Sequence, residues 1–168
     1  MKKTLPPLCL LSILSAFALA YADESLISKN KTQLELSQYL NVKTLEIRAK
    51  QGDLEAMIDL SNYYVSNLKT IKEAVYWSEE AANHGSTEAM ERLGFLYRED
   101  PTIRDLSKSF FWFKQAAEHG KGIARIELAK MYANGITVQQ DLKTAKYWLL
   151  RAKELSIETP NELRFLIE

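Results

Sequence analysis

The chain has 168 residues, 46% of them hydrophobic, and its 22 Lys and Arg residues balance 22 Asp and Glu residues. This balance excludes the clustered basic excess that a nucleic-acid-binding surface needs, so we expect no nucleic-acid partner. The length is sufficient to bury a core by packing alone.

The first 22 residues have the three-part layout of a secretory signal peptide. Lys2 and Lys3 precede an apolar run, Leu8–Leu19, and small residues follow it. Cleavage after Ala20 and cleavage after Ala22 are both compatible with this layout, and the acidic pair after Ala22 favours the second. The run is shorter than the ~20 residues that a membrane span needs. We therefore predict export to a bacterial periplasm, or alternatively secretion, without stable membrane insertion.

The remainder of the chain is expected to be a polar lead-in and then a series of helices. Residues 23–37 show little periodicity, and we expect partial disorder there. Residues 38–168 show no sustained period-2 alternation, so we predict no sheet. A first helix, Gln38–Gln51, is expected to cap the N-terminal end of the helical array. The single cysteine, Cys9, lies in the leader, so the mature chain would contain no disulfide.

One spacing occurs three times after this first helix. Each of three tryptophans has an alanine four residues later, in the pairs Trp77–Ala81, Trp112–Ala116 and Trp148–Ala152. An Ala-x3-Leu-x3-Tyr unit precedes each tryptophan, at 56–64, 89–97 and 124–132. The step from Tyr to Trp varies, being 13, 15 and 16 residues, and is therefore a loop between two packed helices. A period of about 33–36 residues made of two helices indicates a helix-pair solenoid.

Helix start and stop signals divide the array into repeats at about 53–85, 86–120 and 121–156. Glycines that suit a left-handed C-terminal residue end the second helices: Gly52, Gly85 and Gly120. The expected first helices are Asp53–Ser66, Thr87–Arg98 and Gly122–Asn134, and the expected second helices are Ile71–His84, Asp105–His119 and Leu142–Leu155. A C-terminal cap, 159–168, is predicted to hold a short helix to Ile167, with Thr159 as N-cap and Pro160 in the first turn.

The repeated small residues predict close helix packing beside buried tryptophans. An alanine one turn after Trp lies on the same helix face and lets the neighbouring helix approach. Truncating a buried Trp to Ala costs roughly 3–5 kcal/mol. We therefore predict that Trp112→Ala destabilises the protein more than changes in the C-terminal cap do.

The third repeat resembles the Sel-one-like repeat, a relative of the tetratricopeptide repeat. It reads Ala124-x3-Leu128-Ala129-x2-Tyr132-Ala133-Asn134-Gly135-x2-Val138-x2-Asp141-Leu142-x2-Ala145-x2-Trp148-x3-Ala152. The resemblance covers residues 41–156 and implies an all-α, right-handed α/α superhelical solenoid of about three repeats with capping helices at both ends. It also implies a protein-binding adaptor or scaffold. Repeats 1 and 2 depart from the loop motif, and the chain lacks the cysteines of disulfide-pinned exported relatives, some of which were linked to β-lactam chemistry.

No motif in the chain assembles an active site, so we predict a non-enzyme without cofactor or metal. Ser28-x2-Lys31 and Ser66-x2-Lys69 match the Ser-x-x-Lys pattern of penicillin-recognising enzymes but lack its companion elements. His84 and His119 each precede a repeat glycine, where a polar residue suits the helix end. A shared metal between them is the alternative interpretation.

The side of each first helix turned away from its apolar stripe is the predicted binding face, because the resemblance places these helices on the concave surface. Phe95 is expected at its centre, among charged residues that would form a rim. The alternative is a second layer of core. The predicted protein-binding residues are Glu55, Ile58, Asn62, Glu88, Glu91, Phe95, Arg98, Ile123, Ile126 and Lys130, with Val65 and Ala133 at the same helical angles.

These observations predict an exported adaptor or scaffold that recognises another protein or peptide on its concave surface. An inhibitor or immunity protein that neutralises an envelope-acting toxin is the first alternative. A cell-wall or penicillin-interacting hydrolase is the remote one. We expect a monomer.

Overall fold

The structure is a computed structural model that describes residues 33, 36–37, 40–66 and 70–168. The predicted leader, its two cleavage sites and the Ser28–Lys31 motif lie outside the described residues, as does Lys69. The chain divides into two compact units, Met1–Thr44 and Leu45–Glu168.

The described part of the first unit is helical. Residues 33, 36–37 and 40–44 all have helical conformation, and Thr44 Oγ1 donates a hydrogen bond to the carbonyl of Leu40 at 2.9 Å. The described positions of the expected lead-in are therefore helical.

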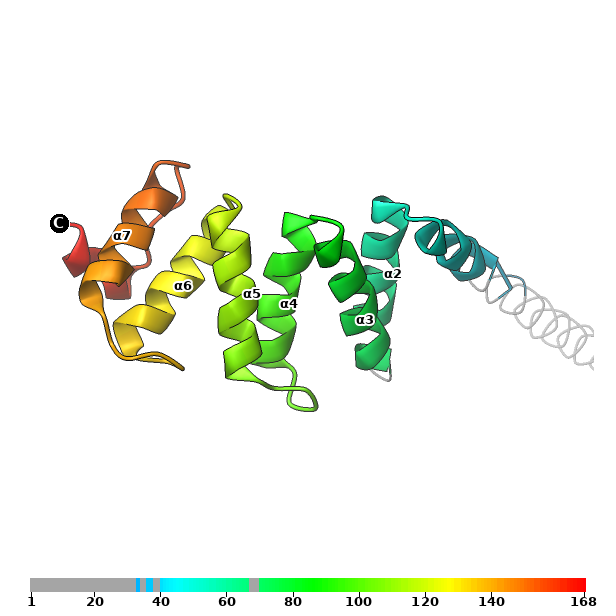
Figure 1. Cartoon of the computed structure of the whole chain (residues 1–168), viewed down its shortest axis with the longest axis horizontal. Coiled ribbons are helices and arrows are strands. Elements are labelled where there is room, and N and C mark those ends of the chain that lie inside the picture. The colour runs from blue at the N-terminus through cyan, green and yellow to red at the C-terminus, as the bar shows by residue number, and fades with distance from the viewer. Residues whose placement is uncertain (1–32, 34–35, 38–39, 67–69) are drawn as a thin grey trace, which may run out of the picture. The chain divides into compact units, whose positions relative to one another are not determined.

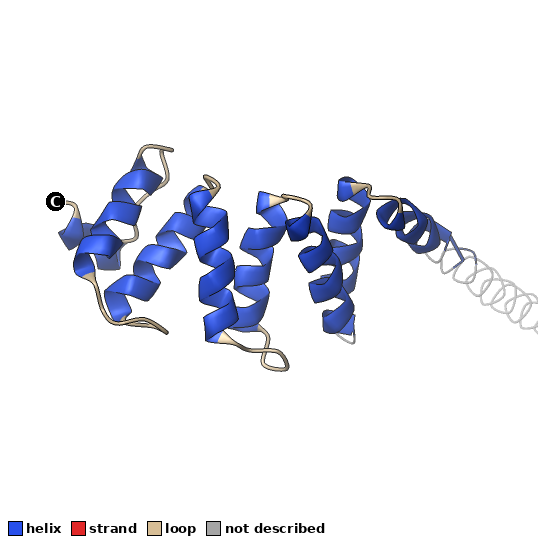
Figure 2. Cartoon of the chain, in the orientation of Figure 1, coloured by secondary structure: helices blue, strands red, loops and turns tan. Residues whose placement is uncertain are grey.

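The second unit consists of helices joined by short loops, and its described residues contain no strand (Figure 2). Residues 45–50 are helical, and Gln51 lies in the next turn. The later helices are α2 (Leu54–Ser66), α3 (Ile71–Asn83), α4 (Thr87–Glu99), α5 (Leu106–Glu118), α6 (Gly122–Asn134) and α7 (Leu142–Lys153), and the 3-10 helix η2 (Asn161–Leu166) comes after them.

Each helix packs against the next one along the chain, in the order shown in Figure 1. Helices α2 and α3, α4 and α5, and α6 and α7 form the three pairs, and α4 also contacts α6 across a repeat boundary. This arrangement confirms the predicted all-α solenoid of helix pairs.

Aspartates and glycines set the helix ends at equivalent places in the repeats. Asp105 and Asp141 cap α5 and α7, each accepting two backbone N–H bonds of 2.9–3.0 Å with Oδ1. Gly52, Gly85 and Gly120 have φ of 89°, 88° and 94°, the left-handed conformation that was predicted at the helix C-termini.

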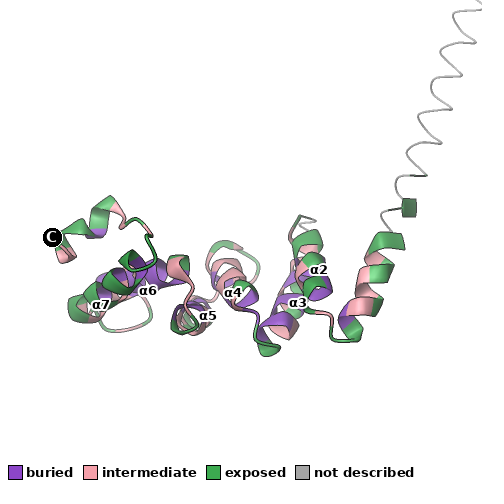
Figure 3. Cartoon of the chain, turned by 90° about the horizontal axis from the view of Figure 1, so that it is seen from above, coloured by how far each residue is buried: buried purple, intermediate pink, exposed green. Residues whose placement is uncertain are grey.

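The core lies where paired helices face one another, as the buried segments in Figure 3 show. Ala81, Ala116 and Ala152 have no exposed surface, which confirms that these positions permit close approach. A Cβ on Gly94 would lie 2.6 Å from the Phe113 ring, so α4 and α5 meet more closely than any side chain there would allow.

The tryptophans are less uniformly buried than predicted. Trp77 is buried, whereas Trp112 and Trp148 are only partly buried. In α5 the fully buried ring belongs to Phe113, because its position faces Gly94 directly while Trp112 lies one residue earlier and therefore points elsewhere around the helix. The expectation that every repeat tryptophan is buried is therefore wrong for Trp112 and Trp148.

The C-terminal segment covers the last repeat, as predicted, but with different local geometry. Leu163 of η2 is buried in a cluster with Ile126 and Leu149, which joins the cap to α6 and α7. The cap contains a 3-10 helix, and its N-cap is Pro160, without a side-chain capping bond. The prediction that Thr159 is the N-cap of this short helix, with Pro160 in its first turn, was wrong.

Candidate protein-binding groove

A groove with a volume of about 570 Å³ opens along α4, between its outward face and the junction of α2 with α3. The α4 residues that line it follow the helical period closely enough to form one stripe. Val65 at the end of α2, Ile71 at the start of α3, and the turn after α4 complete the walls. The α4 stripe comprises Glu88, Glu91, Arg92, Phe95, Leu96 and Glu99, and the turn contributes Asp100 and Pro101.

Phe95 lines this groove and is held firmly in place by its neighbours. Its ring packs edge-to-face on Phe113, with centroids 5.0 Å apart, and Phe113 has no exposed surface. The guanidinium of Arg98 lies 4.9 Å from the centre of the Phe95 ring. A side chain fixed between these neighbours loses little conformational freedom on binding, which favours its use as an anchor.

Four carboxylates, called the rim below, share the lining of the groove with apolar side chains, called the floor. The side chains of Glu88 and Glu99 are 54% and 63% exposed, and each forms an ion pair with a neighbouring arginine, Arg92 at 3.2 Å and Arg98 at 2.8 Å. The pKa of Asp100 is lowered because the side chain and backbone N–H of Thr102 donate hydrogen bonds to it. The lowered pKa keeps the Asp100 carboxylate ionised at neutral pH.

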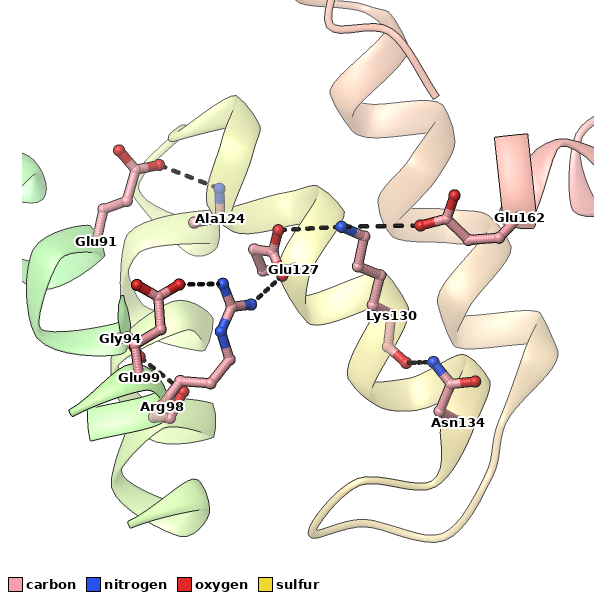
Figure 4. A network of polar contacts seen from close by, with 10 residues as sticks. Glu91, Gly94, Arg98, Glu99, Ala124, Glu127, Lys130, Asn134 and Glu162 are labelled. Carbon is pink, nitrogen blue, oxygen red and sulfur yellow. Dashed lines mark hydrogen bonds and ion pairs between the residues drawn. The ribbon is translucent and has the colours of Figure 1, made fainter. Parts of the chain in front are cut away.

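Two of the predicted residues, Glu91 and Arg98, hold α4 to α6 (Figure 4). Glu91 accepts a hydrogen bond of 3.1 Å from the backbone N–H of Ala124. Arg98 forms an ion pair with Glu127, whose side chain is only 10% exposed and also lies 3.2 Å from Lys130. The Glu91–Ala124 and Arg98–Glu127 contacts cross the boundary between the second and third repeats and stabilise the junction, whereas Lys130 and Glu127 both lie on α6.

The structure thus separates the predicted binding face into three groups. Glu88, Glu91 and Phe95 line the groove, together with Val65, and Glu91 also belongs to the junction with Arg98 and Lys130. Residues away from the groove and the junction are Glu55 and Asn62, which are exposed, Ile58, which is partly buried, and Ile123, which is 50% exposed.

Ile126 was placed on the binding face, and the structure shows that it is core. Its exposed fraction is 5%, and it packs in the cluster that contains Leu163. Ala133 is buried in the same cluster. The physical reason is that α5, α7 and the C-terminal cap surround α6, so a face that is open on α4 is covered there.

Some groove residues were not predicted. Counting from Tyr97 at 100° per residue places Arg92, Leu96 and Glu99 about 140°, 100° and 160° away, so helical periodicity was sufficient to find them. Ile71 and the turn residues Asp100 and Pro101 lie on other elements. Their proximity to the α4 stripe depends on how the pairs pack.

The two histidines occupy helix C-caps. His84 caps α3 and His119 caps α5, and each has Nδ1 at 2.8 Å from the carbonyl four residues earlier. In the part of the chain that the structure describes, no group of three His, Cys, Asp or Glu side chains could hold a metal ion. Within the same residues, no helix has both the length and the apolar character needed to cross a membrane.

The second unit is a helical-repeat solenoid of the scaffold class. Its helix pairs have equivalent caps and glycines, and one of its first helices carries the groove. The Sel1 repeat model matches residues 54–86, 87–121 and 122–156, which together make up more than half of the chain. The chain therefore belongs to the Sel1 repeat family, whose repeats mediate protein–protein interactions.

Two solved structures support this assignment. A Sel1 repeat protein from Oxalobacter formigenes is 29% identical with a TM-score of 0.64, and the match covers 74% of this chain and 98% of that one. A protective antigen of uropathogenic Escherichia coli strains with an SLR fold is 28% identical with a TM-score of 0.63. That match covers 69% of this chain and 26% of the antigen. No curated protein has a significant match to the sequence.

Proposed function

We propose that this protein is an exported, non-catalytic scaffold that binds a segment of a partner protein in the groove along α4. The observation that carries this proposal is the juxtaposition of a fixed aromatic, Phe95, with an apolar floor and a charged rim in one cavity of about 570 Å³. Apolar centres with polar rims are typical of protein-binding sites, and aromatic residues are frequent anchors. Membership of an interaction-repeat family supports the same function.

Replacing the anchor tests the groove directly. Phe95→Ala should weaken binding of a captured partner by ~2 kcal/mol or more, because a central aromatic contributes most where water is excluded. Phe165→Ala is the matched control, since Phe165 is 66% exposed on the C-terminal cap and lies outside the groove. Affinity should be measured per folded molecule, with the fold checked by circular dichroism.

Equal affinities for the two variants would contradict the groove proposal. Loss of fold in Phe95→Ala, with unchanged affinity in the folded fraction, would show that Phe95 acts only as core.

Export is the second part of the proposal and rests on the leader. Mass spectrometry of protein recovered from a bacterial envelope fraction should find an N-terminus at Tyr21 or Asp23, because small residues precede both positions. A mature protein that retains Met1 in that fraction would contradict cleavage.

A further inference from the structure

We infer that the groove along α4 recognises a basic peptide segment that carries one large apolar side chain between Lys or Arg residues. This inference rests on the proposed function and specifies the chemistry of its partner. It follows from the charge, shape and spacing of the groove lining.

The groove lining contains more acidic than basic side chains, although the whole chain is neutral. Four lining residues are acidic and one, Arg92, is basic, whereas the full sequence has 22 acidic and 22 basic residues. The lining therefore has an excess of acidic side chains, and Arg92, Lys121 and Arg98 each pair with one of its three glutamates. Such a rim attracts cationic partners and opposes phosphorylated or acidic segments.

Part of this acidic lining remains available to a ligand. The side chain of Glu91 is 16% exposed and is engaged with Ala124 N and with Lys121 at 3.8 Å. Glu88 and Glu99, in contrast, are more than half exposed and pair with their arginines through Oε1. Because both side chains are exposed, their Oε2 atoms can accept hydrogen bonds from an incoming ammonium or guanidinium group.

The spacing of these residues sets the length of the ligand. Glu88 and Glu99 are 11 residues apart on α4, which corresponds to about 16 Å along a helix. An extended peptide covers that distance in about five residue steps, that is, with about six residues. Phe95 lies about 10 Å from Glu88 and about 6 Å from Glu99 along the helix axis, so the apolar residue should lie about three positions from one basic residue and about two from the other.

The floor accommodates the apolar residue of such a peptide. Val65, Ile71, Phe95, Leu96 and Pro101 all contribute apolar surface to the cavity. Its volume of about 570 Å³ lies within the range of ordinary ligand sites and exceeds what one side chain fills, so neighbouring peptide backbone also enters.

A random peptide library displayed on phage tests this specificity with the full-length protein as bait. Binders that are lost on Phe95→Ala should be enriched in a large apolar residue flanked by Lys or Arg. For a synthetic peptide of this class, Glu88→Gln/Glu99→Gln should weaken binding about tenfold, because two exposed charge pairs are removed. Added salt should weaken binding to the unmodified protein and have less effect on the variant.

The matched control removes the same charge elsewhere. Glu118→Gln/Glu154→Gln replaces two exposed carboxylates that lie at the ends of α5 and α7, outside the groove, and should leave affinity unchanged. Both double variants replace exposed side chains, and thermal unfolding checks that they fold equally well.

The experiment distinguishes failure of the charge inference from failure of the proposed function. Phe95-dependent peptides without basic residues, or with affinity that is insensitive to Glu88→Gln/Glu99→Gln, would overturn the charge inference while supporting the groove. A selection that returns no Phe95-dependent peptide would contradict the proposed function itself.

Discussion

Two tyrosines at equivalent positions of the first and second repeats each combine packing of the ring with one hydrogen bond. Tyr97 is 5% exposed and donates a hydrogen bond of 2.9 Å to Glu79, eighteen residues earlier. Tyr64 makes the same type of bond to Glu46 over the same separation, at 3.3 Å. Each tyrosine therefore fixes a first helix to the helix that precedes it through its ring and one hydrogen bond.

Tyr97 should make stability dependent on alkaline pH. Burial, followed by the hydrogen bond to Glu79, raises the pKa of Tyr97 to about 12, above the unfolded value of about 10. The neutral phenol therefore stabilises the fold fully below pH ~10, and this contribution is lost as pH rises towards ~12. Urea unfolding between pH 9 and 12 should show that the stability advantage over Tyr97→Phe shrinks across this window. A constant difference would contradict the raised pKa.

At the scale of helices, polar contacts at the helix ends and between repeats determine which helices pack together. Arg125 is buried, with 8% exposure, and donates to the carbonyl of Ala117 at 3.2 Å and to that of Arg151 at 2.7 Å. It thereby joins the C-terminal ends of α5 and α7, where a positive charge suits both helix dipoles. The junction of α4 with α6 uses Arg98 and Glu127 in a similar way.

Breaking the Arg98–Glu127 pair should be costly. Arg98→Ala leaves a carboxylate that is 10% exposed without its main partner, and we expect a loss of ~3 kcal/mol in unfolding free energy. Because the double variant removes that carboxylate as well, Arg98→Ala/Glu127→Ala should be less destabilised than the sum of the single variants. Denaturant unfolding of the four proteins in the cycle measures this coupling.

The exposed pair on the same helix provides the control for this cycle. Arg92 and Glu88 are separated by 3.2 Å and are 23% and 54% exposed, so their coupling should be only ~0.3–0.5 kcal/mol. Equal coupling in the two pairs would show that the Arg98–Glu127 contact does not stabilise the junction.

At the scale of the whole second unit, stability should be concentrated in the middle of the array. Phe113 lies in α5, which packs against both α4 and α6, whereas Leu163 lies in the C-terminal cap. Phe113→Ala should cost ~3–5 kcal/mol and reduce the denaturant midpoint more than Leu163→Ala, because a central repeat shares core on both sides. Truncating the partly buried Trp112 to alanine should lower the unfolding free energy less than Phe113→Ala does. A larger loss for Leu163→Ala would indicate that the cap, rather than the central repeat, limits stability.

The helix pairs, their ends and their small-residue contacts could all be predicted from the order of the amino acids. Periodicity and capping chemistry act within a few residues, so the bounds of α6, the left-handed Gly85 and the buried Ala116 were accessible in this way. Periodicity also placed Phe95 on the outward side of its helix. The same spacing indicated the family. Stacked repeats must make equivalent contacts, so the residues that make them recur at a fixed spacing in the sequence.

Only the tertiary structure decided which outward faces of the first helices stay exposed, because segments distant in the sequence can cover them. Phe95 and Ile126 both lie on the side of a first helix turned away from its repeat tyrosine, yet Phe95 lines a groove while Ile126 is covered by the C-terminal cap. Burial depends on neighbours from distant parts of the chain, and helical angle contains no information about them. Ile71 and Pro101 joined the groove for the same reason, since packing between helix pairs brings them beside the α4 stripe.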